Sequence, residues 1–88
     1  MIVIYTHMAR RDLLRLQGET ARRIVKKMRW FASQKNPLAF AKPLRDARFG
    51  SYRFRVGDYR ILVDLAGKQV RVLTVLAVRH RKDVYKLL

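Results

Sequence analysis

The sequence predicts an α+β fold in which a helical hairpin packs on a mainly antiparallel sheet. Two segments with helical spacing of apolar residues occupy the first half of the chain, and the spacing changes to a period of two from Ser51. Three consecutive strands joined by short turns form an antiparallel meander, and two amphipathic helices cover one of its faces. The predicted order is β-α-α-β-β-β, in a single domain that spans residues 1–88.

The elements of the first half are a strand and two helices. Residues 2–5 form a short β-branched run that is typical of a strand. Thr6 is a suitable N-cap for a helix that extends to Leu16. A second helix covers residues 19–33, where Glu19 suits the positive end of the helix dipole. Pro37 ends it, because the residue before a proline avoids the α region.

The second half begins with an irregular connection over residues 35–50. In residues 52–56, aromatic and apolar side chains alternate with arginines, which predicts a half-buried strand. Gly57-Asp58 is a tight turn signal, and the same alternation returns in residues 59–65. These two segments are therefore expected to pair as a hairpin.

The last strand of the meander covers residues 70–78 and follows a turn at residues 66–68. Apolar residues occupy both of its sides, so we expect it to be central and buried on both faces. Residues 81–88 form either a short helix or an extended tail.

The composition points to a polyanionic partner. The chain has 21 Lys and Arg against 6 Asp and Glu, and the formal net charge of +15 is divided almost equally between the two halves. This balance predicts salt-sensitive affinity for nucleic acid or an acidic protein. Membrane-surface binding is the rival interpretation, but no lipidation motif supports it. The lack of cysteine excludes disulfides and thiol catalysis. With no signal peptide or long apolar run, we expect a cytoplasmic protein.

The hairpin carries the candidate binding residues. Alternation places Arg53 and Arg55 on the face opposite Phe54, and pairing brings Arg60 beside them. The helices cover one face of the sheet, and these arginines are expected to point toward the other, open face. A fixed row of guanidinium groups suits the phosphates of RNA. The alternative is an ordinary solvated sheet face.

Three segments carry a resemblance to a known family. They are residues 44–50 (LRDARFG), residues 52–61 (YRFRVGDYRI) and residues 80–85 (HRKDVY). In this order and spacing the chain resembles the RelE/ParE toxin superfamily, the toxin halves of toxin–antitoxin pairs, over nearly its whole length. The resemblance implies a RelE-like domain that cuts ribosome-bound messenger RNA without a metal or cofactor, by attack of a ribose 2′-hydroxyl on the adjacent phosphate. It also implies an acidic, RelB-like antitoxin as a partner.

The resemblance also implies the site residues. The family's paired basic residues on one strand correspond to Arg53 and Arg55, and its arginine on the following strand corresponds to Arg60. The family's C-terminal arginine corresponds to Arg81, and its base-stacking tyrosine corresponds to Tyr85. His80 takes the place of an acid or base candidate, and Lys82 joins the RNA-binding residues. The predicted catalytic residues are thus Arg53, Arg55, Arg60, His80, Arg81 and Tyr85; the predicted RNA-binding residues are Arg53, Arg55, Arg60, Arg81, Lys82 and Tyr85.

The residues alone do not identify which groups transfer protons in the reaction. Arginine, with a pKa above roughly 12, is a poor proton shuttle. Glu19 is the only glutamate and lies in the helical hairpin, so a glutamate base is disfavoured. His80 is the best titrating group, because an ordinary histidine pKa near about 6.5 suits neutral conditions. The alternative interpretation of His80 is an ordinary surface histidine without a catalytic role. The alternative interpretation of Tyr85 is a side chain that packs the C-terminal segment against the core.

Two other functions compete with RNA cleavage. The superfamily also contains ParE-like inhibitors of DNA gyrase, which share the scaffold. A non-catalytic RNA-binding domain is the third interpretation, and its binding would have a steep salt dependence. In each toxin interpretation we expect the antitoxin to lay a helix or strand over the basic face.

Overall fold

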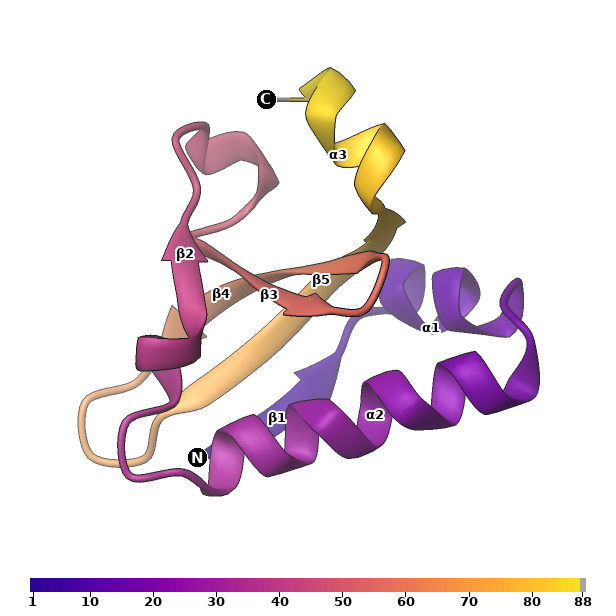
Figure 1. The fold of residues 1–88 in the computed structure, drawn as a ribbon. Coiled ribbons are helices and arrows are strands. Elements are labelled where there is room, and N and C mark those ends of the chain that lie inside the picture. The colour runs from indigo at the N-terminus through magenta and orange to yellow at the C-terminus, as the bar shows by residue number, and fades with distance from the viewer. Residues whose placement is uncertain (88) are drawn as a thin grey trace.

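A single sheet forms the centre of the molecule (Figure 1). The computed structural model describes the backbone of residues 1–87 and the side chains of residues 1–84. Over that part of the chain five strands pair in the order β1-β5-β4-β3-β2. Their bounds are β1 Ile2–Tyr5, β2 Ala41–Pro43, β3 Tyr52–Val56, β4 Tyr59–Ala66 and β5 Val72–His80. The pair β1–β5 is parallel and the other pairs are antiparallel, so the predicted α+β class is confirmed.

The helices agree closely with the sequence prediction. They are α1 (His7–Leu14), α2 (Gly18–Ser33) and α3 (Arg81–Leu87), with single 3-10 turns at Pro37–Phe40 (η1) and Ala47–Phe49 (η2). The Thr6 hydroxyl accepts from the Ala9 N–H, which confirms the expected N-cap. The α-helix α1 ends two residues before Leu16, because the Arg15 N–H turns back to Asp12 and Leu13 carbonyls.

The hydrophobic core lies between α2 and one face of the sheet. Ile24, Met28 and Phe31 of α2 are each at most 4% exposed. They belong to one cluster with the inward side chains of β3, β4 and β5, namely Phe54, Val56, Ile61, Val63, Leu73, Val75 and Val78. Phe31 stacks on Phe54 with ring centroids 4.8 Å apart, which fixes α2 against β3.

Two expectations about the second half need correction. The connection over residues 35–50 contains the strand β2, which pairs with β3. The predicted last strand lies at Val72–His80, because Val70 belongs to the turn and is 64% exposed. The expectation that this strand is central and buried on both faces is confirmed, because it lies between β1 and β4 and its successive residues Ala77 and Val78 are both buried.

The face predicted to be open is partly covered. The helix α3 stands over the ends of β4 and β5, on the side of the sheet away from α2 (Figure 1). That side carries the buried Leu62 and Ala77, and Val84 of α3 is 1% exposed. Apolar side chains on this face need a cover, and Val84 supplies part of it; of the two predicted forms of this segment, Arg81–Leu87 is a helix. Within the described residues, no helix has both the length and the apolar character needed to cross a membrane.

Candidate nucleic-acid interface

The β3–β4 hairpin brings the predicted arginines together. Arg55 lies directly opposite Arg60 in the strand register, and Arg53 lies one pair further along. Neighbouring β2 places Lys42 opposite Arg53. Opposed residues share a face of the sheet, so all four cations lie on the face away from α2. The sequence prediction that these three arginines gather on one face is therefore confirmed.

These cations surround a hollow of about 310 Å³. It is lined by Phe40, Lys42, Arg53, Arg55 and Arg60, which we call the basic hollow. Arg55 is exposed, Arg53 is half-buried and Arg60 is only 8% exposed. The hollow thus combines a buried cation, Arg60, with the more exposed cations Arg53 and Arg55.

Arg60 is anchored through one end of its guanidinium group. Its Nη1 donates to the carbonyls of Gly57 and Tyr59, each at 3.1 Å. Both acceptors belong to the hairpin turn that carries the arginine. A guanidinium group has five N–H donors in a planar fork, so Nε and Nη2 keep three of them. The turn therefore orients a free fork edge that fits two oxygens of a phosphate.

Among the side chains of residues 1–84, no carboxylate compensates the basic hollow. The ion pairs among the described side chains are Arg48–Asp46, Arg79–Asp12 and Arg81–Asp58, and all lie outside it. A buried cation without an acidic partner among these side chains is costly, so the charge of the hollow suits an external anion. Among residues 1–84, no three side chains of His, Cys, Asp and Glu gather in a group that could hold a metal ion.

Two acids of the loops near the hairpin, Asp46 and Asp58, interact with other arginines. Asp46, at the start of η2, accepts the backbone N–H and side-chain N–H groups of Arg48. These hydrogen bonds hold the pKa of the Asp46 carboxyl below its ordinary value. Asp58 lies 3.8 Å from the Arg81 guanidinium group, and both side chains are more than half exposed. Neither acid neutralises the arginines of the hairpin.

His80 does not line the basic hollow. It pairs with Tyr59 in the register, one position from Arg60, so the pleat places it on the opposite face. Its ring contacts the Tyr59 ring edge-on at a centroid distance of 5.5 Å. Its Nδ1 accepts the Lys82 N–H at 3.2 Å, which leaves Nε2 as the protonated nitrogen of a neutral ring.

The start of α3 lies beside the hairpin turn. The Arg81 N–H donates to the Asp58 carbonyl at 2.7 Å, and the Arg81 and Lys82 side chains are exposed. These two cations therefore lie near the turn that separates Arg55 from Arg60, but neither lines the hollow. The backbone of Tyr85 belongs to α3, and its side chain lies outside the part of the chain that the structure describes.

Sequence reasoning missed Phe40 and Lys42. Phe40 is 46% exposed and packs edge-on against Trp30 at 5.1 Å, so its ring is held firmly at the rim of the hollow. An exposed aromatic ring beside cations is a stacking surface for a base. Both residues come from η1 and β2, and a strand of three residues is too short to show a period of two.

Comparison with known proteins decides the family. The family model described as "ParE toxin of type II toxin-antitoxin system, parDE" matches residues 3–85. This chain is a RelE/ParE-family toxin. The assignment of the chain to the toxin half of a type II toxin–antitoxin pair, which the three sequence segments predicted, is confirmed.

Individual relatives agree with this assignment. Toxin RelG of Mycobacterium tuberculosis is 33% identical over 84 residues, which are 96% of this chain and 94% of the relative. The toxin–antitoxin complex RelBE2 of the same organism contains a chain with a TM-score of 0.72 and 31% identity, covering 91% of this chain and 96% of that chain.

More distant structures share the fold. A chain of the RelB–RelE antitoxin–toxin complex from Methanococcus jannaschii has a TM-score of 0.64 at 21% identity, covering 97% of this chain and 98% of that chain. The YoeB/ParE toxin from Agrobacterium tumefaciens has a TM-score of 0.67 at 18% identity, covering 91% and 98%. Both confirm the helical hairpin on a mainly antiparallel sheet.

Proposed function

We propose that this toxin is a ribosome-dependent messenger-RNA endonuclease of the cytoplasm, and that residues 1–88 act as one toxin domain. The observation that carries the proposal is Arg60, a cation that is 8% exposed and shares the basic hollow with Arg53 and Arg55. It has no acidic partner among the described side chains. The hollow is the binding site for the scissile phosphate. Phe40 offers a ring on which one neighbouring base stacks.

The reaction is an internal transfer at phosphorus. The ribose 2′-hydroxyl loses its proton and attacks the adjacent phosphate, and the bond from phosphorus to the 5′-oxygen breaks. The products are a 2′,3′-cyclic phosphate and a 5′-hydroxyl that has gained a proton, so no water, metal or cofactor is consumed. The transition state carries extra negative charge on phosphorus-bound oxygens. The free fork of Arg60 faces this charge, while Arg53 and Arg55 hold the backbone on either side.

Proton transfer is assigned separately from charge stabilisation. His80 stays our candidate for one of the two proton transfers, and Nε2 is the nitrogen available for it because Nδ1 accepts from Lys82. Because His80 lies on the face of Tyr59, opposite the basic hollow, this role requires the reacting ribose itself to lie at the end of β5, within hydrogen-bond reach of Nε2. Arg81, Lys82 and Tyr85 at the start of α3 are proposed to contact the RNA there.

The direct test follows transcript ends in cells and in a translation extract. Primer extension should show new ends in translated messages after expression of the toxin, and the Arg60→Ala variant should lose them. The Lys68→Ala variant serves as a matched control, because it removes one exposed cation from the turn beyond the opposite end of β4. Undiminished cleavage by both Arg60→Ala and Arg81→Ala would remove the arginine assignment.

A second candidate function is inhibition of DNA gyrase. The observation that favours it is the family model itself, which describes ParE toxins. Gyrase-dependent DNA breaks with intact messenger RNA would decide for this function. Binding to RNA with a steep salt dependence, combined with intact transcripts and normal growth, would instead indicate a non-catalytic RNA-binding domain.

The proposed partner is an acidic, RelB-like antitoxin. The two related complexes described above contain antitoxins, and one of them is named RelB. The net charge of +15 on this chain suits an acidic polypeptide. Co-expression with the product of an adjoining reading frame should restore growth, and a basic or absent adjoining product would argue against this partner.

A further inference from the structure

The last part of α2 carries an exposed aromatic ring beside the basic hollow. Trp30 is 43% exposed, although a ring of this size gains much from burial. Its ring packs against the Phe40 ring with centroids 5.1 Å apart, and Phe40 lines the basic hollow. Trp30 itself does not line the hollow. Its contact with Phe40 therefore links α2 to the hollow on the other face of the sheet.

Local contacts hold Trp30 in place. Its ring also meets the Phe31 ring edge-on at 5.6 Å, and Phe31 belongs to the hydrophobic core. The Trp30 carbonyl accepts from Ser33 Oγ at 2.7 Å and from Gln34 Nε2 at 3.0 Å, which satisfies an acceptor near the end of α2. Both the ring and its backbone are thus fixed, so the exposed part of the ring is a preorganised surface.

Cations follow the same side of α2. Lys27 Nζ lies 4.3 Å from the centre of the Trp30 ring. Arg23 lies one helical turn before Lys27, and its guanidinium group reaches the hairpin turn, where a Cβ added at Gly57 would lie 2.5 Å from it. The only acid of α2 is Glu19, in the first turn at the other end of the helix. The exposed ring is therefore bordered by positive charge along α2, and the basic hollow lies beyond its aromatic neighbour.

The angle between the two rings selects the kind of nucleic acid. The ring planes of Trp30 and Phe40 differ by 71°. Successive bases of a duplex are stacked nearly parallel, so they cannot lie flat on both rings at once. Two unstacked bases of a flexible single strand can do so, because each base is free to turn away from its neighbour. The two rings thus suit single-stranded RNA that bends at this point.

We propose that Trp30 and Lys27 form a second nucleotide subsite, which takes the unpaired base next to the one on Phe40. This base stacks on the exposed part of the Trp30 ring, and the phosphate that joins the two nucleotides meets Lys27. The subsite favours purines, because a base with two rings covers more of an indole than a base with one ring does. The inference rests on the proposed function, since it extends the RNA path that begins in the basic hollow.

Continuity with the hollow favours RNA over an acidic protein segment. A strand whose phosphate lies in the hollow has one base on Phe40, and the Trp30 ring is the adjoining aromatic surface. An acidic segment would satisfy Lys27 and Arg23 but would bring no flat group to the exposed ring. The two occupants therefore differ in whether the environment of the Trp30 ring depends on a base.

The test uses the tryptophan itself as the probe. Trp30 is the only tryptophan of the chain, so the intrinsic tryptophan fluorescence reports on this ring alone. The ligands are RNA hexamers with 2′-O-methyl groups, which bind without being cut because the attacking hydroxyl is blocked. An adenine hexamer should quench the fluorescence in a saturable way. An abasic hexamer, which keeps every phosphate, and a glutamate peptide of equal charge should leave most of the fluorescence unchanged.

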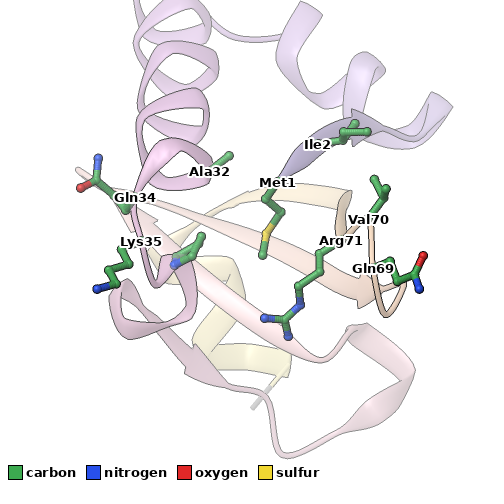
Figure 2. A pocket seen from close by; sticks show the side chains of 9 residues that line it. Met1, Ile2, Ala32, Gln34, Lys35, Gln69, Val70 and Arg71 are labelled. Atoms are coloured by element: carbon green, nitrogen blue, oxygen red, sulfur yellow. The ribbon is translucent and has the colours of Figure 1, made fainter.

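Variants separate stacking from general attraction. In fluorescence anisotropy of a labelled adenine hexamer, Trp30→Leu should weaken binding at least about fivefold, and Trp30→Phe should weaken it less, because a ring is kept. Lys27→Ala should weaken binding more than its matched control Arg71→Ala. Arg71 is an exposed cation in a separate hollow beside Met1 (Figure 2), and no aromatic side chain is among the residues that line that hollow.

The outcomes distinguish this inference from the proposed function. A toxin that cuts no message but shows quenching that depends on the base keeps the subsite and loses the nuclease. Equal quenching by adenine and abasic hexamers, or by the glutamate peptide, would overturn the subsite even in a toxin that cuts messages. Equal affinity for adenine and uracil hexamers would overturn the purine preference. If Trp30→Leu does not fold, the quenching of the unaltered toxin and the affinity of Trp30→Phe decide.

Discussion

Loss of the Arg60 side chain should slow RNA cleavage much more than it destabilises the fold. Because Nη1 is held by two carbonyls, Nε and Nη2 remain to form two parallel hydrogen bonds to a phosphate. Hydrogen bonds to charged groups contribute about 1.5–3 kcal/mol each. Partial exposure of the hollow favours the lower value, so the pair contributes about 3 kcal/mol. At about 1.4 kcal/mol per factor of ten, Arg60→Ala should cleave about a hundredfold more slowly.

The assay is the rate of appearance of cleaved ends in a reconstituted translation reaction, with unfolding midpoints measured on the same preparations. The cleavage rate of Arg60→Lys should lie between those of Arg60→Ala and the unaltered toxin. An ammonium group keeps the charge, but it cannot hold both turn carbonyls and a phosphate. Lys68→Ala removes the same charge from a distant exposed turn, so its cleavage rate should change less than about threefold through weaker general attraction.

Stability separates this prediction from simple unfolding. Arg60→Ala leaves the Gly57 and Tyr59 carbonyls without their side-chain donor, which costs about 1 kcal/mol each, the low end of the range, because water can reach this exposed turn. It also removes a buried charge that has no acidic partner, which acts in the opposite direction. We therefore expect a midpoint close to that of the unaltered toxin. A normally folded Arg60→Ala protein that cleaves as fast as Lys68→Ala would refute the reasoning.

Three further variants test the site and its scaffold. Phe40→Leu should weaken binding of a short single-stranded RNA by about 1–3 kcal/mol in fluorescence anisotropy and leave an abasic strand unaffected, since only base stacking is lost; an equal loss for both strands would argue against stacking. His80→Gln should reduce cleavage less than Arg60→Ala does and flatten the pH dependence of the cleavage rate if Nε2 transfers a proton; an unchanged profile would remove His80 from the mechanism. Gly67→Ala should lower the denaturation midpoint more than Gly57→Ala, although both glycines have positive φ. A Cβ added at Gly67 would lie 2.0 Å from the Val70 carbonyl oxygen, which belongs to the backbone. A Cβ added at Gly57 would lie 2.5 Å from the guanidinium group of Arg23, a flexible side chain that can move away. Equal midpoints would contradict this comparison.

The hairpin could be predicted because its signals are local. Alternation fixes which side of a strand Arg53 and Arg55 occupy, and the Gly57-Asp58 turn sets the register that brings Arg60 beside Arg55. The signal for the helix start at Thr6 is equally local, because its hydroxyl accepts from the N–H of Ala9, only three positions further along the chain. These features depend on the nearest neighbours along the chain, and the sequence contains them directly.

Other features depend on distant contacts and could not be read in this way. The strand β2 has three residues, and its pairing with β3 rather than its own composition makes it a strand. Phe40 reaches the basic hollow because Trp30 and Phe31 support its ring from another helix. The face on which His80 lies depends on its exact position in the pairing of β5 with β4, because a shift of one residue moves a side chain to the other face of the sheet.

The most direct test of the central claim maps the chemistry of the new RNA ends. Messages purified from a translating extract with this toxin should carry 2′,3′-cyclic phosphates upstream of the cut and 5′-hydroxyls downstream, with cleavage only while ribosomes are bound. The same preparation of Arg60→Ala should yield these ends about a hundredfold more slowly. Intact messages beside gyrase-dependent DNA breaks, or ends that bear 5′-phosphates, would contradict the account.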